Sequence, residues 1–142
     1  MTYEIVSIRA TKKEIKVVRP DDLFPLIKRY AKSRQEHFLV ITLDTEHKVI
    51  GIHISTIGLM NKTIIHPREV FYHAIKDNAC AIMLAHNHPS GQLKPSLDDE
   101  EMTKRLVKAG EIMGFLILDH LIFSKDSFYS FRQSRHESIM AF

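Results

Sequence analysis

Two histidines two positions apart, His86 and His88, are the residues of this 142-residue sequence best suited to carry chemistry. They follow an apolar run that predicts a buried strand, and side chains at positions i and i+2 of a strand point to the same side. Asp99 lies further along the chain, where a helix is predicted to begin, so its carboxylate can fold back to meet the two imidazoles. Two histidines and one carboxylate bind zinc with one coordination position open for water, as a catalytic zinc requires.

Each of these residues also has a simpler structural interpretation. A lone histidine is most often a solvated or hydrogen-bonded side chain with no ligand. Ser96 and Asp99 have the spacing of a capping box, in which the two side chains stabilise the start of a helix. The two roles are compatible, because a capped helix start is a rigid support for a metal ligand. Asp98 and Glu100 are alternatives to Asp99, since spacing alone does not separate neighbouring carboxylates.

The spacing of these residues resembles the JAMM motif of the MPN/JAB metallohydrolases: His86-x-His88-Pro89, six residues, Ser96, two residues and Asp99. The fuller string from residue 85 to 91, with Pro-Ser at 95–96, resembles the RadC branch of that family. Segments 66–71, 118–120 and 129–132 also look RadC-like, so the resemblance extends from about residue 21 onwards. It implies the MPN/JAB fold, a cytidine-deaminase-like three-layer arrangement.

The resemblance implies a zinc ion held by His86, His88 and Asp99, with water as the fourth ligand. Such a centre would make the protein a zinc-dependent metallohydrolase, a peptidase or isopeptidase in which metal-activated water attacks an amide bond. One residue departs from the pattern, because the peptidase branch usually has Ser or Thr where this chain has Asn87. The class of substrate is therefore left open.

The JAMM pattern also needs a glutamate at the start of the strand that follows the first helix, and Glu36 holds that place. Glu46, in a predicted hairpin turn, and Glu69, on a predicted helix, are less favoured alternatives. The resemblance implies that Glu36 accepts a proton from the attacking water and later passes it to the leaving amine. It also implies that Ser96 donates a hydrogen bond to the developing oxyanion or to the metal-bound water.

The elements expected to position these residues mix strands and helices without strict alternation, which favours an α+β domain with a mixed β-sheet flanked by helices. Residues 3–19 predict a hairpin or two edge strands, and Asp21 or Asp22 is expected to cap the first helix. The further strands are predicted at 38–43, 49–55, 79–85, 115–123 and 128–131. Two further helices are predicted, one from Pro67 with an apolar stripe at 70, 71, 74 and 75, and one from Ser96 to Gly114.

RadC proteins commonly carry an N-terminal helix-hairpin-helix region, which 142 residues leave no room for, so we expect a short standalone form. The predicted organisation is one RadC-like MPN/JAB domain over residues 1–142, with N-terminal strands in 1–20 and the metal-site core in 21–142. Two competing functions follow from the same resemblance. One is a DNA-repair-associated nucleic-acid-binding or nuclease protein, and the other is a catalytically silent MPN scaffold.

The composition is that of an ordinary globular protein, with 44% hydrophobic residues, 26% charged residues and a net charge of +3. The basic residues are scattered, which permits contact with nucleic acid without favouring it. No apolar run approaches about 18 residues, so no membrane span is expected. The single cysteine, Cys80, lies in an apolar run that predicts a core position, and with no signal pattern at the N-terminus this fits a cytoplasmic protein.

The expected partners are therefore an unidentified protein or peptide substrate, with nucleic acid as the second option and no membrane. A homodimer could form through edge strands exposed near the N-terminus.

Overall fold

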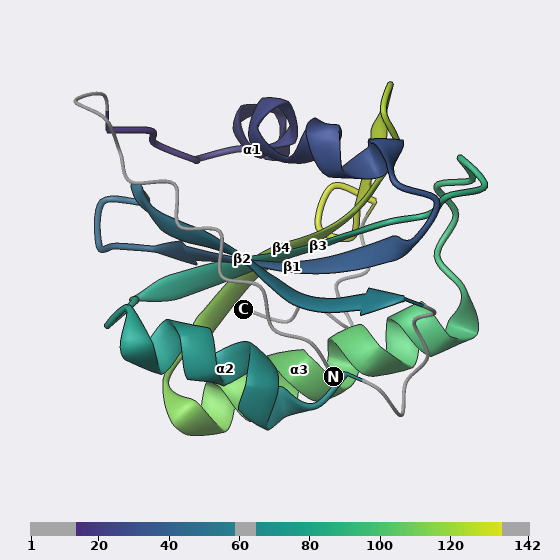
Figure 1. Cartoon of the computed structure of the whole chain (residues 1–142). Coiled ribbons are helices and arrows are strands. Elements are labelled where there is room, and N and C mark those ends of the chain that lie inside the picture. Colours follow the sequence, from purple (N-terminus) through teal and green to yellow (C-terminus); the bar gives the residue numbers. More distant parts are fainter. Residues whose placement is uncertain (1–13, 59–64, 135–142) are drawn as a thin grey trace.

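A five-stranded sheet forms the centre of the molecule in the computed structural model, which describes residues 14–58 and 65–134 (Figure 1). The strands lie in the order β2-β1-β3-β4-β5. They are β1 (Glu36–Leu43), β2 (Val49–Gly58), β3 (Ala81–Asn87), β4 (Leu116–Phe123) and β5 (Phe128–Ser130). β3 and β4 run parallel, whereas β1 pairs antiparallel with β2 and β3, and β4 with β5. The predicted α+β fold with a mixed sheet is confirmed.

Helices cover both faces of the sheet and make the fold three-layered (Figure 1). α1 (Pro20–Ile27), continued by the 3₁₀ helix η1 (Lys28–Lys32), lies on one face. α2 (Pro67–Lys76) and α3 (Leu97–Met113) lie on the other. Among the described residues, no helix is long and apolar enough to cross a membrane.

The inner strands are apolar on both faces because each face is covered by helices. Along β1, Phe38 and Val40 pack in the core beneath α2 and α3, while Leu39 and Ile41 pack in the core beneath α1. All four side chains are fully buried. The strand that carries His86, β3, is buried at every position, so its functional end is held by neighbours on both sides and both faces.

α3 is stabilised at both ends by its own sequence. Ser96 is the N-cap, and Gly114 ends the helix in the left-handed conformation with φ of 82°, as predicted. The first turn is acidic, which suits the positive end of the helix dipole. The start of this helix is therefore rigid, and it is the part that faces the end of β3.

The first helix begins at Pro20, earlier than predicted, and Asp22 stabilises its start as the third helical residue. Its side chain accepts hydrogen bonds from the backbone N–H groups of Val18 and Arg19 at 3.0 and 2.9 Å. Two other local predictions are wrong. Cys80 is exposed, because β3 begins one residue later, at Ala81. In α2, Ile75 is 60% exposed and a polar residue, His73, takes the buried position.

The predicted N-terminal strands lie mostly in residues 1–13, outside the described residues. Of the remainder, Lys16 forms an isolated antiparallel bridge with Lys48, and Val17 N–H donates to the carbonyl of His47 at 2.8 Å.

A buried polar cluster joins β1, β2 and the end of α2. Asp77 accepts a hydrogen bond from Thr42 and contacts His53 Nε2, both at 2.6 Å. The ring of His53 stacks on that of His73, with centroids 4.5 Å apart. Gly51 leaves the space for this arrangement, since a Cβ there would lie 2.7 Å from His53 Nε2.

Acid should destabilise the protein through His73. Burial, with a smaller contribution from the neighbouring His53, lowers the pKa of His73 from 6.5 to about 4. Above pH 6.5 the side chain is neutral in the folded and the unfolded chain. Between pH 6.5 and about 4 only the unfolded chain takes up the proton, so this residue lowers the free energy of unfolding as pH falls, by at most about 1.4 kcal/mol per pH unit.

Urea unfolding across this pH range measures the effect. The control is His73→Phe, which keeps an aromatic ring against His53 but cannot titrate, and it should show a shallower pH dependence. Equal pH dependence in the two proteins would contradict the assignment.

Candidate metal centre

Three side chains bring metal-ligating atoms together at the end of β3. His86 Nε2 lies 3.1 Å from His88 Nε2 and 3.2 Å from Asp99 Oδ1. His88 Nε2 lies 3.3 Å from Asp99 Oδ2. His86 and Asp99 are buried, and His88 is partly buried. Within the described residues, these three side chains form a group that could hold a metal ion. The structure thus brings together the three residues predicted as ligands.

The secondary structure explains how the three residues meet. His86 is the next-to-last residue of β3 and His88 follows the strand, so both face the side covered by α3. Ser96 and Asp99 form the predicted capping box: Asp99 N–H donates to Ser96 Oγ at 3.0 Å, and Ser96 N–H donates to Asp99 Oδ2 at 2.8 Å. The cap therefore fixes the carboxylate opposite the two imidazoles.

Hydrogen bonds on the far side of each imidazole direct its other nitrogen at the cluster. His88 Nδ1 lies 2.7 Å from the backbone carbonyl of Gln92, which can only accept, so Nδ1 is the donor. In the neutral ring the lone pair then lies on Nε2, towards Asp99. His86 Nδ1 lies 2.8 Å from His120 Nε2, deep in the core. A backbone carbonyl, as at His88, is a typical partner of a metal-binding histidine, whereas His86 has an imidazole in that place.

The electrostatics of the cluster favour a cation. Burial alone would raise the pKa of Asp99, but the hydrogen bonds to His86 and His88 hold it far below its usual value. Burial alone would lower the pKa of His88, yet Asp99 and the Gln92 carbonyl raise it. Each group therefore stabilises the charge of the other, and the carboxylate is ionised at neutral pH. A metal ion would replace the proton in this arrangement.

The donor set fits zinc. Ligands of a tetrahedral zinc at about 2.0–2.1 Å from the metal lie roughly 3.3 Å from one another. The two imidazole nitrogens lie 3.1 Å apart, and each lies close to one oxygen of the carboxylate, His86 Nε2 at 3.2 Å from Oδ1 and His88 Nε2 at 3.3 Å from Oδ2. Two imidazole nitrogens and one carboxylate fill three positions and leave the fourth open towards solvent.

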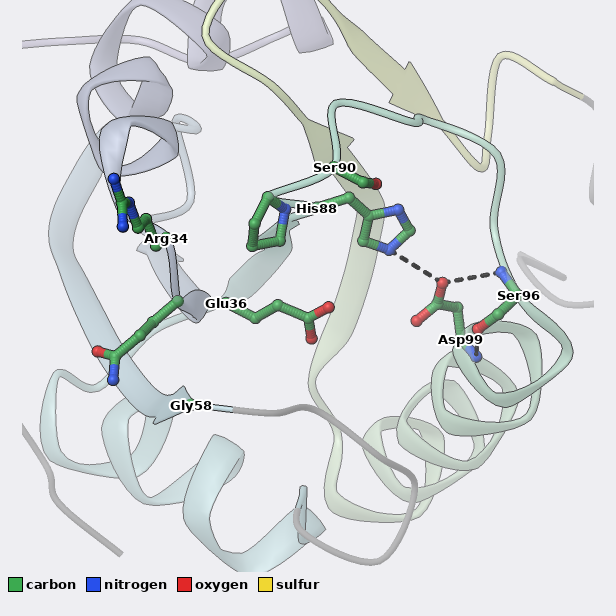
Figure 2. A pocket seen from close by; sticks show the side chains of 9 residues that line it. Arg34, Glu36, Gly58, His88, Ser90, Ser96 and Asp99 are labelled. Carbon is green, nitrogen blue, oxygen red and sulfur yellow. Dashed lines mark hydrogen bonds and ion pairs between the residues drawn. The ribbon is translucent and has the colours of Figure 1, made fainter.

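A pocket of about 540 Å³ opens beside the cluster (Figure 2). His88 and Asp99 line it, and Figure 2 shows Glu36 reaching across it towards them from the start of β1. Ser96 also lines the pocket, and its hydroxyl, which accepts from Asp99 N–H, retains its proton for donation. The structure thus places both predicted catalytic residues beside the cluster, while their roles stay predictions.

The alternatives left open by the sequence do not line this pocket: Asp98, Glu100, Glu46 and Glu69. Asp98 is exposed at the start of α3, and Glu46 pairs with Lys48 at 2.8 Å in the β1–β2 turn. Glu69 is buried in the first turn of α2.

Asn87 holds the backbone on both sides of Glu36. Its side chain is fully buried. The side-chain oxygen Oδ1 accepts a hydrogen bond from His37 N–H at 2.6 Å, and the side-chain nitrogen Nδ2 donates to the carbonyl of Gln35 at 3.0 Å. One partner can only donate and the other can only accept, which fixes the orientation of the amide. A shorter serine or threonine could not bridge both groups in this way. The departure from the peptidase pattern therefore has a structural role that sequence reasoning missed.

A second hollow of about 580 Å³ shares His88, Pro89 and Arg34 with the pocket. Lys32 and Lys125 also line it, against one acidic residue, Asp126. The surface on this side of the His86–His88–Asp99 cluster therefore carries a local excess of positive charge.

Comparison with known proteins decides the family. The model of the RadC-like JAB domain matches residues 17–136. The chain belongs to this family. A UPF0758 protein of Alkaliphilus metalliredigens is 42% identical over 131 residues, covering 90% of this chain and 56% of the relative. Another, from Methanospirillum hungatei, is 43% identical over 125 residues, covering 87% and 56%. A third, from Caldanaerobacter subterraneus subsp. tengcongensis, is 48% identical over 109 residues, covering 75% and 46%. This RadC-like domain therefore spans about half the length of the curated relatives it matches.

The RadC-like domain should bind about one zinc ion per chain, and His88→Ala should abolish tight binding because it removes one of three ligands. Elemental analysis after zinc loading and desalting measures the stoichiometry. His47→Asn is the matched control, since this histidine lies in the β1–β2 turn away from the cluster. Zinc retained by His88→Ala at the wild-type level would contradict the assignment of His88.

Proposed function

We propose that this protein is a zinc-dependent hydrolase that cleaves an amide bond, a peptide or an isopeptide. The observation that carries the proposal is the grouping of His86, His88 and Asp99 beside a pocket that also contains Glu36 and Ser96. Membership of the RadC-like JAB domain family supports it. When bound, zinc supplies a Lewis acid that brings the pKa of water towards ~7.

Glu36 is proposed as the general base and then the general acid. It reaches into the pocket from β1 and faces the open side of the cluster (Figure 2). A carboxylate at this place can take a proton from water as the carbonyl is attacked and return it to the amine that leaves. Asn87 fixes the peptide units on both sides of Glu36, so the base does not depend on a mobile loop for its position.

Ser96 is proposed to stabilise the oxyanion that develops on the attacked carbonyl. Its oxygen is fixed by the N–H of Asp99, which leaves the hydroxyl proton to point into the pocket. Loss of one such donor typically lowers the rate by about 10²–10³. The same serine caps α3, so its removal would also weaken the helix start by about 1 kcal/mol.

Glu36→Gln should retain zinc and lose turnover, because the amide keeps the shape of the side chain but cannot accept the proton. The assay incubates zinc-loaded protein with a mixed peptide library and with peptides branched through lysine Nε, and detects new termini by mass spectrometry. The wild-type protein should generate termini that a chelator prevents, while the variant should generate none.

Full cleavage by Glu36→Gln would remove Glu36 from the mechanism. No cleavage of either library by the zinc-loaded wild-type protein would contradict amide hydrolysis, and a catalytically silent scaffold would then be the better description.

A second candidate function is binding of nucleic acid, favoured by the positive charge of Lys32, Arg34 and Lys125 next to the cluster. Phosphate contacts of this kind make affinity fall steeply as salt rises. Measuring the affinity for a single-stranded oligonucleotide at several salt concentrations tests it. Binding that weakens with salt and is reduced by Lys32→Ala would support this function, and salt-independent or undetectable binding would contradict it.

A further inference from the structure

His86 is connected to α3 by a continuous chain of buried polar groups that includes the imidazole of His120 in β4. His86 Nδ1 lies 2.8 Å from His120 Nε2, and His120 Nδ1 lies 2.6 Å from Thr103 Oγ1. Thr103 Oγ1 in turn donates to the backbone carbonyl of Asp99 at 2.7 Å. His86, His120 and Thr103 are all fully buried, so water does not compete for these contacts.

The register of the sheet makes this chain possible. His86 in β3 is paired with Ile122 in β4, and His120 lies two residues before Ile122, on the same face. That face is covered by α3, where Thr103 lies one turn after Asp99. β3 and β4 therefore contribute one imidazole each to the chain, and α3 contributes the hydroxyl of Thr103 and the carbonyl of Asp99.

The hydrogen bond from Thr103 to the carbonyl of Asp99 fixes the direction of the other two hydrogen bonds in the chain. A carbonyl can only accept, so the single proton of the Thr103 hydroxyl points to the carbonyl of Asp99. Thr103 must then accept from His120, which places the proton of this imidazole on Nδ1. A fully buried imidazole with no carboxylate against its ring nitrogens is neutral, so His120 Nε2 accepts and His86 Nδ1 donates.

The consequence is a defined tautomer of the metal ligand. With its proton on Nδ1, His86 presents the lone pair of Nε2 to His88 and Asp99. The opposite tautomer would direct an N–H at the same place and could not bind a metal ion through Nε2.

Aromatic rings hold the two histidines in this geometry. Phe131 stacks on His120 with ring centroids 5.0 Å apart and planes 10° apart. Phe38 stacks on His86 at 6.1 Å and meets His120 edge-on at 5.8 Å. Both ends of the chain lie at the same residue, because Asp99 Oδ1 is 3.2 Å from His86 Nε2 and the backbone carbonyl of Asp99 accepts from Thr103.

We propose that Thr103 and His120 are positioning residues that fix His86 in the Nδ1–H tautomer and thereby prepare the cluster to bind zinc. The proposal rests on the proposed zinc site for its functional meaning, whereas the tautomer itself is a property of the metal-free protein. Neither residue touches the metal position, and both act through His86.

The first test measures zinc affinity by competition with a chromogenic chelator. Thr103→Val keeps the shape of the side chain but removes the hydroxyl that accepts from His120, and His120→Leu removes the acceptor for His86. Both should weaken zinc binding by about 10–100-fold, the usual effect of losing a partner of a metal ligand. Thr103→Ser restores the hydroxyl and should bind zinc close to the wild-type level. Near-wild-type affinity in Thr103→Val would overturn the proposal.

The second test reads the tautomers directly. Nitrogen-15 NMR of the metal-free wild-type protein, above the ordinary pKa of histidine, distinguishes protonated from unprotonated ring nitrogens. Protons on Nδ1 of both His86 and His120 are expected, and a neutral His86 with its proton on Nε2 and none on Nδ1 would overturn the proposal. His120→Leu provides the control, since His86 should then populate both tautomers.

The two tests separate the inference from the function on which it rests. A wild-type protein that binds no zinc contradicts the proposed zinc site, while the NMR result still decides whether the tautomer is fixed. Thermal unfolding of each variant shows whether it is folded, and the wild-type protein and Thr103→Val match in side-chain shape and differ in the hydroxyl.

Discussion

The close approach of two imidazole nitrogens and a buried carboxylate is the constraint on which the rest of the site depends. His86 Nε2 and His88 Nε2 lie 3.1 Å apart with Asp99 against both. Lone pairs at this separation repel one another unless a proton or a metal ion lies between them. The fold must therefore supply rigidity from outside the cluster, and the capping box of α3, the Gln92 carbonyl and the buried contact with His120 do so.

The middle strand of the sheet organises this rigidity. β3 ends with His86 and Asn87 on opposite faces, so His86 lies in the cluster with His88 and Asp99 while Asn87 holds the start of β1 by hydrogen bonds. Its neighbours contribute at the same end: β1 supplies Glu36 and β4 supplies His120. Because β3 is buried at every position, a shift of any one of these groups would disturb several others.

The parts of the site that depend on local sequence could be predicted from it. The spacing of His86 and His88 in a strand, and of Ser96 and Asp99 at a helix start, fixes their directions within a few residues. The contacts of His120, Thr103 and Asn87 could not be predicted because they depend on strand register and helix docking, which link residues 17 to 52 positions apart. Errors at Cys80 and Ile75 arose where a strand began two residues later than predicted and where the buried face of a helix included a histidine.

X-ray absorption at the zinc edge of the zinc-loaded protein tests the central claim most directly. We expect a four-coordinate zinc with two imidazole nitrogens and two oxygens at about 2.0–2.1 Å, and no sulfur. His86→Ala should lose one imidazole contribution or fail to hold the metal. A shell without imidazole nitrogen, or a spectrum unchanged in His86→Ala, would contradict a metal centre built from His86, His88 and Asp99.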